Sequence, residues 1–168
     1  MIKISFHRRY LIRNIDLLME YIMIIIKNDN NIGFKKEIHT KLRKNNIEKC
    51  EWLKNNISED INVTNKVDVN FLAFDNGKLI GGAIGYIEYN WYFLDLLYID
   101  EEYRGQSIGT KLIKEIERFS KNEDLTGVRM ETWNFQAKGF YEKNGYNVFA
   151  QIEDCPPGTV DYFLKKVL

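Results

Sequence analysis

Apolar and polar positions in the middle of the chain follow the pattern of a β-hairpin and a third strand. Residues 69–75 predict a strand, and the Asn76-Gly77 pair after it favours a two-residue turn because both residues accept positive φ angles. Residues 79–88 predict the returning strand. The run at 91–99 is almost continuously apolar, which is typical of a central strand that is covered on both faces.

The C-terminal half alternates between helical and strand patterns. Apolar side chains recur on one face over 109–121, which predicts an amphipathic helix. A shorter helix is predicted at 135–144, with Gly145 as its left-handed cap. Three further patterns predict strands, at 126–132, 146–152 and 162–167. Hairpins followed by alternating helices and strands indicate an α/β (α+β) fold, with one mixed sheet and helices on both faces.

The N-terminal part is less regular. The β-branched run at 23–27 predicts a strand, and 34–56 predicts a charged helix that is bent or divided near 45–46. We interpret 1–22 as an N-terminal extension of uncertain role, with Met23 as an alternative start of the natural chain. The remaining 23–168 has the length of one domain.

Composition excludes several functions. The chain has 24 basic and 24 acidic residues, and this zero net charge argues against nucleic acid as a partner. Its two cysteines and two histidines lack metal-ligand spacing, so neither a metal site nor a Ser-His-Asp triad is expected. No apolar run reaches the ~18 residues of a membrane span, and no signal peptide is recognisable. We therefore expect a cytoplasmic protein without a membrane partner.

A glycine-containing segment, 104–109, joins the predicted strand at 91–99 to the following helix. The first N–H groups of a helix have no intrahelical partner, and the helix dipole makes this end attractive to anions. Small residues let a pyrophosphate approach the backbone, and Arg104 adds a charged fork of donors. The spacing matches neither a Walker loop nor a Rossmann fingerprint.

A second segment, 131–146, carries a strand into a helix. From the residues alone, Asn134 is interpreted as a helix N-cap and Tyr141 as a core tyrosine. Together the two segments resemble the motifs of the GNAT family of N-acetyltransferases, over about 69–168. The resemblance implies a mixed, mostly antiparallel sheet of about six or seven strands with flanking helices. It also implies an enzyme that transfers an acetyl group from acetyl-CoA to a primary amine by direct attack.

The resemblance also implies roles for individual residues. The strand residues Leu97, Tyr98 and Ile99 would bind the pantetheine arm, and a backbone N–H at or beside Leu97 would polarise the thioester. Asn134 would bond to the pantetheine, and Tyr141 would bind the coenzyme and protonate the departing thiolate. The pyrophosphate would be held by Arg104, Gly105, Gln106, Ser107, Ile108, Gly109 and Thr110.

The base that accepts the amine proton has several candidates. Asp95 is the first, acting through a water, and Glu88 and Glu131 are alternatives. Ser107 stands where the family usually has glycine, so the alternative to an enzyme is a non-catalytic acyl-CoA-binding sensor or partner domain of the same fold.

The acceptor is expected to be a primary amine of a small molecule or a peptide. Aromatic and acidic residues together suit a cationic amine. The residues that could form such a pocket are Tyr86, Tyr89, Trp91, Tyr92 and Trp133, beside Glu88, Asp95, Glu131 and Glu153. A homodimer is a further expectation from the family.

Overall fold

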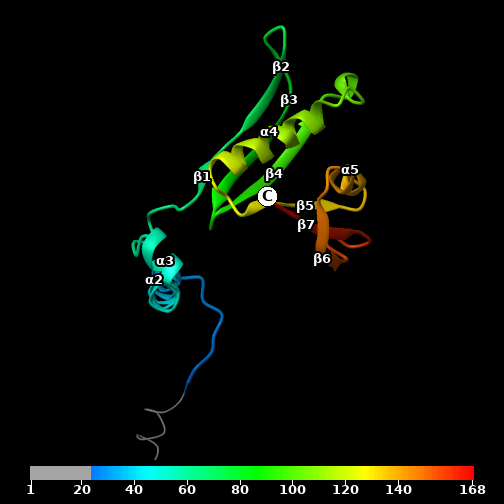
Figure 1. The fold of residues 1–168 in the computed structure, drawn as a ribbon. Helices are drawn as coiled ribbons and strands as arrows, with labels where there is room; N and C mark the ends of the chain where they lie inside the picture. Colours follow the sequence, from blue (N-terminus) through cyan, green and yellow to red (C-terminus); the bar gives the residue numbers. More distant parts are fainter. Residues whose placement is uncertain (1–23) are drawn as a thin grey trace, which may run out of the picture.

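The computed structural model describes residues 24–168, and the interpretation of 1–22 lies outside them. A seven-stranded sheet forms the frame (Figure 1). Its strands are β1 (Val67–Asp68), β2 (Phe71–Asp75), β3 (Lys78–Glu88), β4 (Trp91–Ile99), β5 (Gly127–Trp133), β6 (Asn147–Glu153) and β7 (Val160–Val167). The order is β1-β3-β4-β5-β7-β6, with β2 also paired to β3, and only β4 and β5 are parallel. The predicted α/β (α+β) class with a mixed, mostly antiparallel sheet is confirmed.

The tight turn between β2 and β3 forms as predicted. Asn76 and Gly77 have φ angles of 46° and 83°, and Asp75 pairs with Lys78 across the turn. Two consecutive positive φ angles match the right-handed twist of the flanking strands, which explains why this residue pair is suited to the position.

Four α-helices and a short 3₁₀ helix accompany the described sheet. They are α2 (Ile32–Lys49), α3 (Glu51–Asn56), η1 (Glu101–Tyr103), α4 (Ile108–Asn122) and α5 (Lys138–Lys143). The predicted division of this region into two helices is present, but it lies at Cys50, which is extended, and not near 45–46. The last helix is shorter than predicted, because 134–137 form a turn before it, and Gly145 follows it with a φ of 86°.

The strand predicted at 23–27 is not present over its described residues, 24–27. Ile24, Ile25 and Ile26 are 89%, 69% and 94% exposed, and none of the seven strands pairs with them. A β-branched run favours extended backbone, but a strand is stabilised only by hydrogen bonds and packing against a neighbour. The propensity alone was therefore misleading here.

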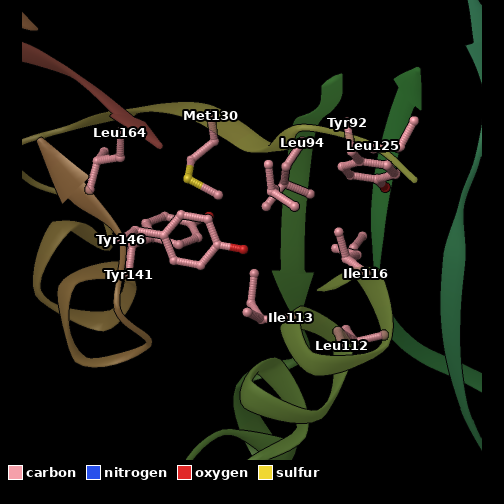
Figure 2. Packing of buried hydrophobic residues seen from close by; sticks show 12 residues of the cluster. Tyr92, Leu94, Leu112, Ile113, Ile116, Leu125, Met130, Tyr141, Tyr146 and Leu164 are labelled. Carbon is pink, nitrogen blue, oxygen red and sulfur yellow. The ribbon is translucent and has the colours of Figure 1, made fainter. Parts of the chain in front are cut away.

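The core lies between the sheet and α4 (Figure 2). Ile113 and Ile116 of α4 are 1% and 0% exposed, and they meet Tyr92, Val128 and other buried strand residues. Burying an aliphatic side chain of this size stabilises the fold by about 1.5–3 kcal/mol. This packing fixes α4 relative to β4.

The central strand β4 is irregular at one residue. On β3, Ile84 pairs with Leu96 and Gly85 pairs with Leu94, so Asp95 is an extra, unpaired residue. A bulge of this kind bends a strand and re-aims its side chains. The expected burial of β4 on both faces is wrong after the bulge, where Leu96 is 60% exposed, because no described helix covers it on the face away from α4.

The two parallel strands in the centre of the sheet separate after a short contact. Their pairing runs from Trp91 and Gly127 to Leu94 and Met130, and it stops there. Beyond this point β4 stays with β3 and β5 stays with β7. The sheet therefore opens between its two central strands.

Candidate active site

A cleft of about 890 Å³ lies where β4 and β5 separate, on the side of α4. It is lined by 95–99 of β4, by the segment between η1 and α4, by the end of β5 and by residues up to Tyr141 on α5. We call it the α4 cleft. The two motif segments of the sequence, 104–109 and 131–146, are separated by about twenty residues along the chain and form its opposite walls.

One wall offers unpaired backbone groups of β4. The N–H of Asp100 donates to the carbonyl of Ile80 on β3 at 2.9 Å. Successive residues of an antiparallel strand point their backbone groups to alternate sides, so Tyr98 turns its own toward β3. Leu97 and Ile99 then direct theirs away from β3, where β5 no longer pairs, although the Ile99 carbonyl accepts a bond from Arg104 Nε. An extended ligand arm could add there as a strand.

A second wall is the N-terminus of α4. Its N-cap is Ser107, which adopts a left-handed φ of 62° and makes no side-chain cap bond. The first intrahelical bond runs from the Lys111 N–H to the Ser107 carbonyl at 3.0 Å. The N–H groups of Ile108, Gly109 and Thr110 precede it, so they are available to an anion in the α4 cleft.

The loop before α4 is tied to the end of β4. Arg104 Nε donates to the Ile99 carbonyl at 3.0 Å, and Nη1 lies 3.6 Å from the Glu101 carboxylate. Gly105 has a φ of 75°, and an added Cβ there would meet nothing within 4 Å. Gln106 turns away from the cleft wall, since its amide donates to the Glu102 carbonyl at 3.3 Å.

Tyr141 of α5 lines the cleft opposite the start of α4. Its side chain is only 6% exposed, and its ring packs edge-to-face against Phe140 at 5.2 Å and Tyr146 at 6.2 Å. Burial raises the pKa of Tyr141 to about 12, because the phenolate is poorly solvated there. The phenol therefore stays protonated over the neutral and moderately alkaline range.

A smaller cavity of about 140 Å³ opens on the face of the sheet away from α4. We call it the open-face pocket. Its residues come from five strands: Tyr86, Phe93, Leu94, Asp95, Arg129, Met130, Glu131, Phe149 and Phe163. Along β5, Val128 and Met130 are buried toward α4 whereas Arg129 and Glu131 are exposed, as the alternation of a strand requires.

The two cavities meet at the same two carboxylates. Asp95 and Glu131 each line both the α4 cleft and the open-face pocket. The bulge places Asp95 at the point where β4 leaves β5, and Glu131 follows Met130, the last β5 residue that pairs with β4. Glu88 is placed elsewhere, in a third cavity beside Lys66 and Tyr89.

Most of the predicted coenzyme residues line one cleft, and two do not. Asn134 is exposed outside the lining residues, as Gln106 is, and its backbone N–H donates to the Val160 carbonyl at 2.9 Å. Its interpretation as a helix N-cap is wrong, because Ala137 occupies that position. The preceding turn is stabilised instead by Gln136, whose amide oxygen accepts from the Trp133 N–H at 3.1 Å.

The aromatic pocket expected from the sequence is only partly correct. Tyr86 lines the open-face pocket, whereas Tyr92 is fully buried and donates its hydroxyl to the Val69 carbonyl at 2.9 Å. Arg129 and its aromatic neighbours were missed. Alternation along β5 could have placed Arg129 on the face of Glu131, but the cross-strand neighbours of both depend on register.

Within 24–168, no group of three or more His, Cys, Asp or Glu side chains is arranged to hold a metal ion. No helix of this described part has the length and apolar character needed to cross a membrane.

Comparison with known proteins identifies relatives of the chain. The sequence model of the Acetyltransferase (GNAT) family matches residues 22–146. Blasticidin-S acetyltransferase of Streptomyces morookaense is 38% identical over 104 residues, which are 61% of this chain and 76% of that protein.

Two solved structures extend this likeness to the fold. An acetyltransferase from Bacillus cereus is 28% identical, with a TM-score of 0.68 over 87% of this chain and 99% of that one. The PaiA N-acetyltransferase of Thermoplasma acidophilum, in complex with coenzyme A, is 27% identical, with a TM-score of 0.53 over 60% and 61%.

Proposed function

Since the chain belongs to the GNAT acetyltransferase family, we propose that it transfers the acetyl group of acetyl-CoA directly to a primary amine of a small molecule. Relatives are named for such acceptors, one for the antibiotic blasticidin S and another for the ε-nitrogen of thialysine. The small volume of the open-face pocket, about 140 Å³, also favours a small acceptor over a folded protein.

One observation carries the proposal, namely that two cavities from opposite faces of the sheet meet at Asp95 and Glu131. The α4 cleft suits the coenzyme, because it combines free N–H groups at a helix start with an unpaired strand edge. The open-face pocket then receives the amine. A bound acetyl group would lie where the strands separate, within reach of an amine from the other side.

In the proposed mechanism, acetyl-CoA supplies the acetyl group as an activated thioester. Asp95 or Glu131 accepts a proton from the attacking amine, directly or through a water, so that the nitrogen lone pair can form the amide bond. The N–H of Leu97, on the side of β4 that β5 has left, donates to the carbonyl oxygen as negative charge develops there.

Tyr141 supplies the second proton. As the carbon–sulfur bond breaks, the Tyr141 hydroxyl donates its proton to the sulfur, which leaves as a thiol. The tyrosine is then reprotonated from solvent, while the carboxylate releases the proton that it took from the amine. The raised pKa of Tyr141, about 12, ensures that the protonated form of this residue is present when the cycle begins.

The test is to follow thiol release from acetyl-CoA with a panel of primary amines, together with calorimetric binding of acetyl-CoA. The proposal expects acetyl-CoA to bind and at least one amine to accelerate thiol release. Tight binding without acceleration by any amine would favour a non-catalytic acyl-CoA-binding domain instead. Absence of coenzyme binding would contradict the assignment of the α4 cleft.

A further inference from the structure

We infer that the acceptor amine also carries an anionic oxygen group, such as a carboxylate, and that Arg129 binds this group in the open-face pocket. The inference rests on the proposed function and specifies its substrate class: a small zwitterion rather than a polyamine. It depends on the charges of a row of residues that pair side by side across neighbouring strands, on the face of the sheet away from α4.

The residues of this row are cross-strand partners on neighbouring strands of the sheet. Tyr86 pairs with Phe93, Phe93 with Arg129, and Arg129 with Lys165, on β3, β4, β5 and β7 respectively. Tyr86 and Phe93 stack with their centroids 5.0 Å apart and an interplanar angle of 12°. The two aromatic side chains therefore form one continuous column on this face.

Protein cations already occupy both ends of this aromatic column. Lys66 Nζ lies 4.1 Å from the centre of the Tyr86 ring, and Arg129 Cζ lies 3.5 Å from the centre of the Phe93 ring. An aromatic ring attracts a cation through its face, and here both outer faces are covered. The aromatic residues therefore serve to hold Arg129 in place rather than to receive a cationic substrate.

Arg129 has no acidic partner within the described chain. Its guanidinium takes part in none of the ion pairs or side-chain hydrogen bonds formed among 24–168, although the residue lines the pocket. The neighbour on its other side, Lys165, is also positive and lies over Phe149 at 5.1 Å. An oriented guanidinium with free donors suits a carboxylate, which it can bind through two parallel hydrogen bonds.

The negative charges of the pocket lie beside this row, further along the strands. Glu131 is two residues after Arg129 on the same face of β5, a distance of roughly 7 Å along the strand. Asp95 lies beside it in both cavities. The pocket thus has a negative end at the reaction site and a positive end at the row. A molecule with an amine and an oxyanion fits both ends, whereas a second cation would meet Arg129.

The test compares amines that differ only in the anionic group. β-Alanine, γ-aminobutyrate and ε-aminocaproate are each assayed beside their own amide, with cadaverine as the dication, by thiol release from acetyl-CoA. We expect at least one amino acid of the series to have a kcat/KM about tenfold or more above that of its amide. Cadaverine should be poorer than either.

Variants connect this preference to Arg129. Arg129→Gln should reduce the acid-to-amide ratio to near one, and Arg129→Lys should retain part of it. Comparing ratios removes differences in intrinsic amine reactivity, because these are the same for every variant. Arg118→Gln is the matched control: Arg118 is an exposed arginine of α4 paired with Glu115 at 2.8 Å, and its loss should leave the ratio unchanged.

The outcomes separate this inference from the proposed function. Acetylation of amides or cadaverine as fast as of the amino acids would overturn the zwitterion inference and leave the acetyltransferase intact. A preference that survives Arg129→Gln would overturn the role of Arg129. Coenzyme binding without transfer to any amine of the series would contradict the proposed function, and the inference with it.

Discussion

The α4 cleft and the open-face pocket share two carboxylates but are built from different kinds of groups. The cleft depends mainly on backbone groups within 97–110, namely those of Leu97 at the strand edge and the N–H groups of 108–110 at the helix start. The pocket depends on side chains from five strands. A backbone site tolerates substitutions and binds one constant ligand, whereas a side-chain site can change its specificity with few substitutions. Coenzyme binding and acceptor choice should therefore respond to different mutations.

We expect the Tyr141 side chain to be needed for turnover but not for binding of acetyl-CoA in the α4 cleft. We expect Tyr141→Phe to lower kcat by about 10²–10⁴-fold, the usual contribution of a general acid, because the departing sulfur loses its proton donor. The affinity for acetyl-CoA should change little, since the backbone groups remain. Steady-state kinetics and calorimetry on the same preparation measure both.

The control for this prediction is Tyr162→Phe. Tyr162 is a half-buried tyrosine of β7 that lies outside the cleft lining, with Lys138 4.6 Å from its ring centre. Removing its hydroxyl should leave kcat unchanged. Equal losses in both variants would mean that the effect is structural and that Tyr141 is not the acid.

The shared carboxylates give the next largest effect. Asp95→Asn or Glu131→Gln should lower kcat/KM at neutral pH by about 10²-fold, whichever is the base, since the amine then loses its proton acceptor. Glu88→Gln is the control, because Glu88 lies in a different cavity, and it should retain activity within about twofold. A loss with Glu88→Gln as large as with the other two would show that the boundary between the cavities is misplaced.

Alkaline pH tests the burial of the cleft wall. An unfolded tyrosine ionises near pH 10, whereas burial raises the pKa of Tyr141 to about 12. The folded state therefore holds this proton more tightly than the unfolded state does. The resulting contribution to the free energy of unfolding is fully present below about pH 10 and is lost as pH rises toward 12. Two pKa units correspond to about 3 kcal/mol. Urea unfolding between pH 9 and 12 should show a shallower decline for Tyr141→Phe than for the parent chain.

The bulge between the cavities depends on a glycine. An added Cβ at Gly85 would lie 2.5 Å from the Tyr92 hydroxyl and would clash with the Phe93 carbonyl, so Gly85→Ala should destabilise the fold by about 2 kcal/mol. Gly139→Ala is the matched control, since a Cβ at this α5 position meets nothing within 4 Å. Alanine should stabilise the helix there by up to about 1 kcal/mol. In thermal unfolding, the midpoint temperature should fall for Gly85→Ala and rise for Gly139→Ala.

The contrast between the α4 cleft and the open-face pocket also explains which features could be predicted from the sequence. The β2–β3 turn and α4 were predicted because Asn76-Gly77 and the helical spacing of 109–121 are local patterns. The row at Arg129 and the separation of β4 from β5 were not, because they depend on which residues pair across strands. The failed strand at 23–27 shows the same limit, since its propensity lacked a partner. Local chemistry locates the cleft, and only register locates the pocket.

Ser107 gives the smallest expected effect and the sharpest test of the backbone site. Its φ of 62° lies in the left-handed region, which is unfavourable for a residue with a Cβ by about 1–2 kcal/mol, and this explains why glycine suits the position. Ser107→Gly should relieve that strain and raise the free energy of unfolding by about 1 kcal/mol, less any entropy that glycine gains in the unfolded chain. The serine hydroxyl makes no cap bond, and the N–H groups of Ile108 and Gly109 remain in place. Coenzyme affinity should therefore stay the same or improve slightly, as calorimetry would show. A marked loss of affinity would mean instead that the Ser107 hydroxyl is itself a ligand, and that this cleft, like the pocket, depends on a side chain.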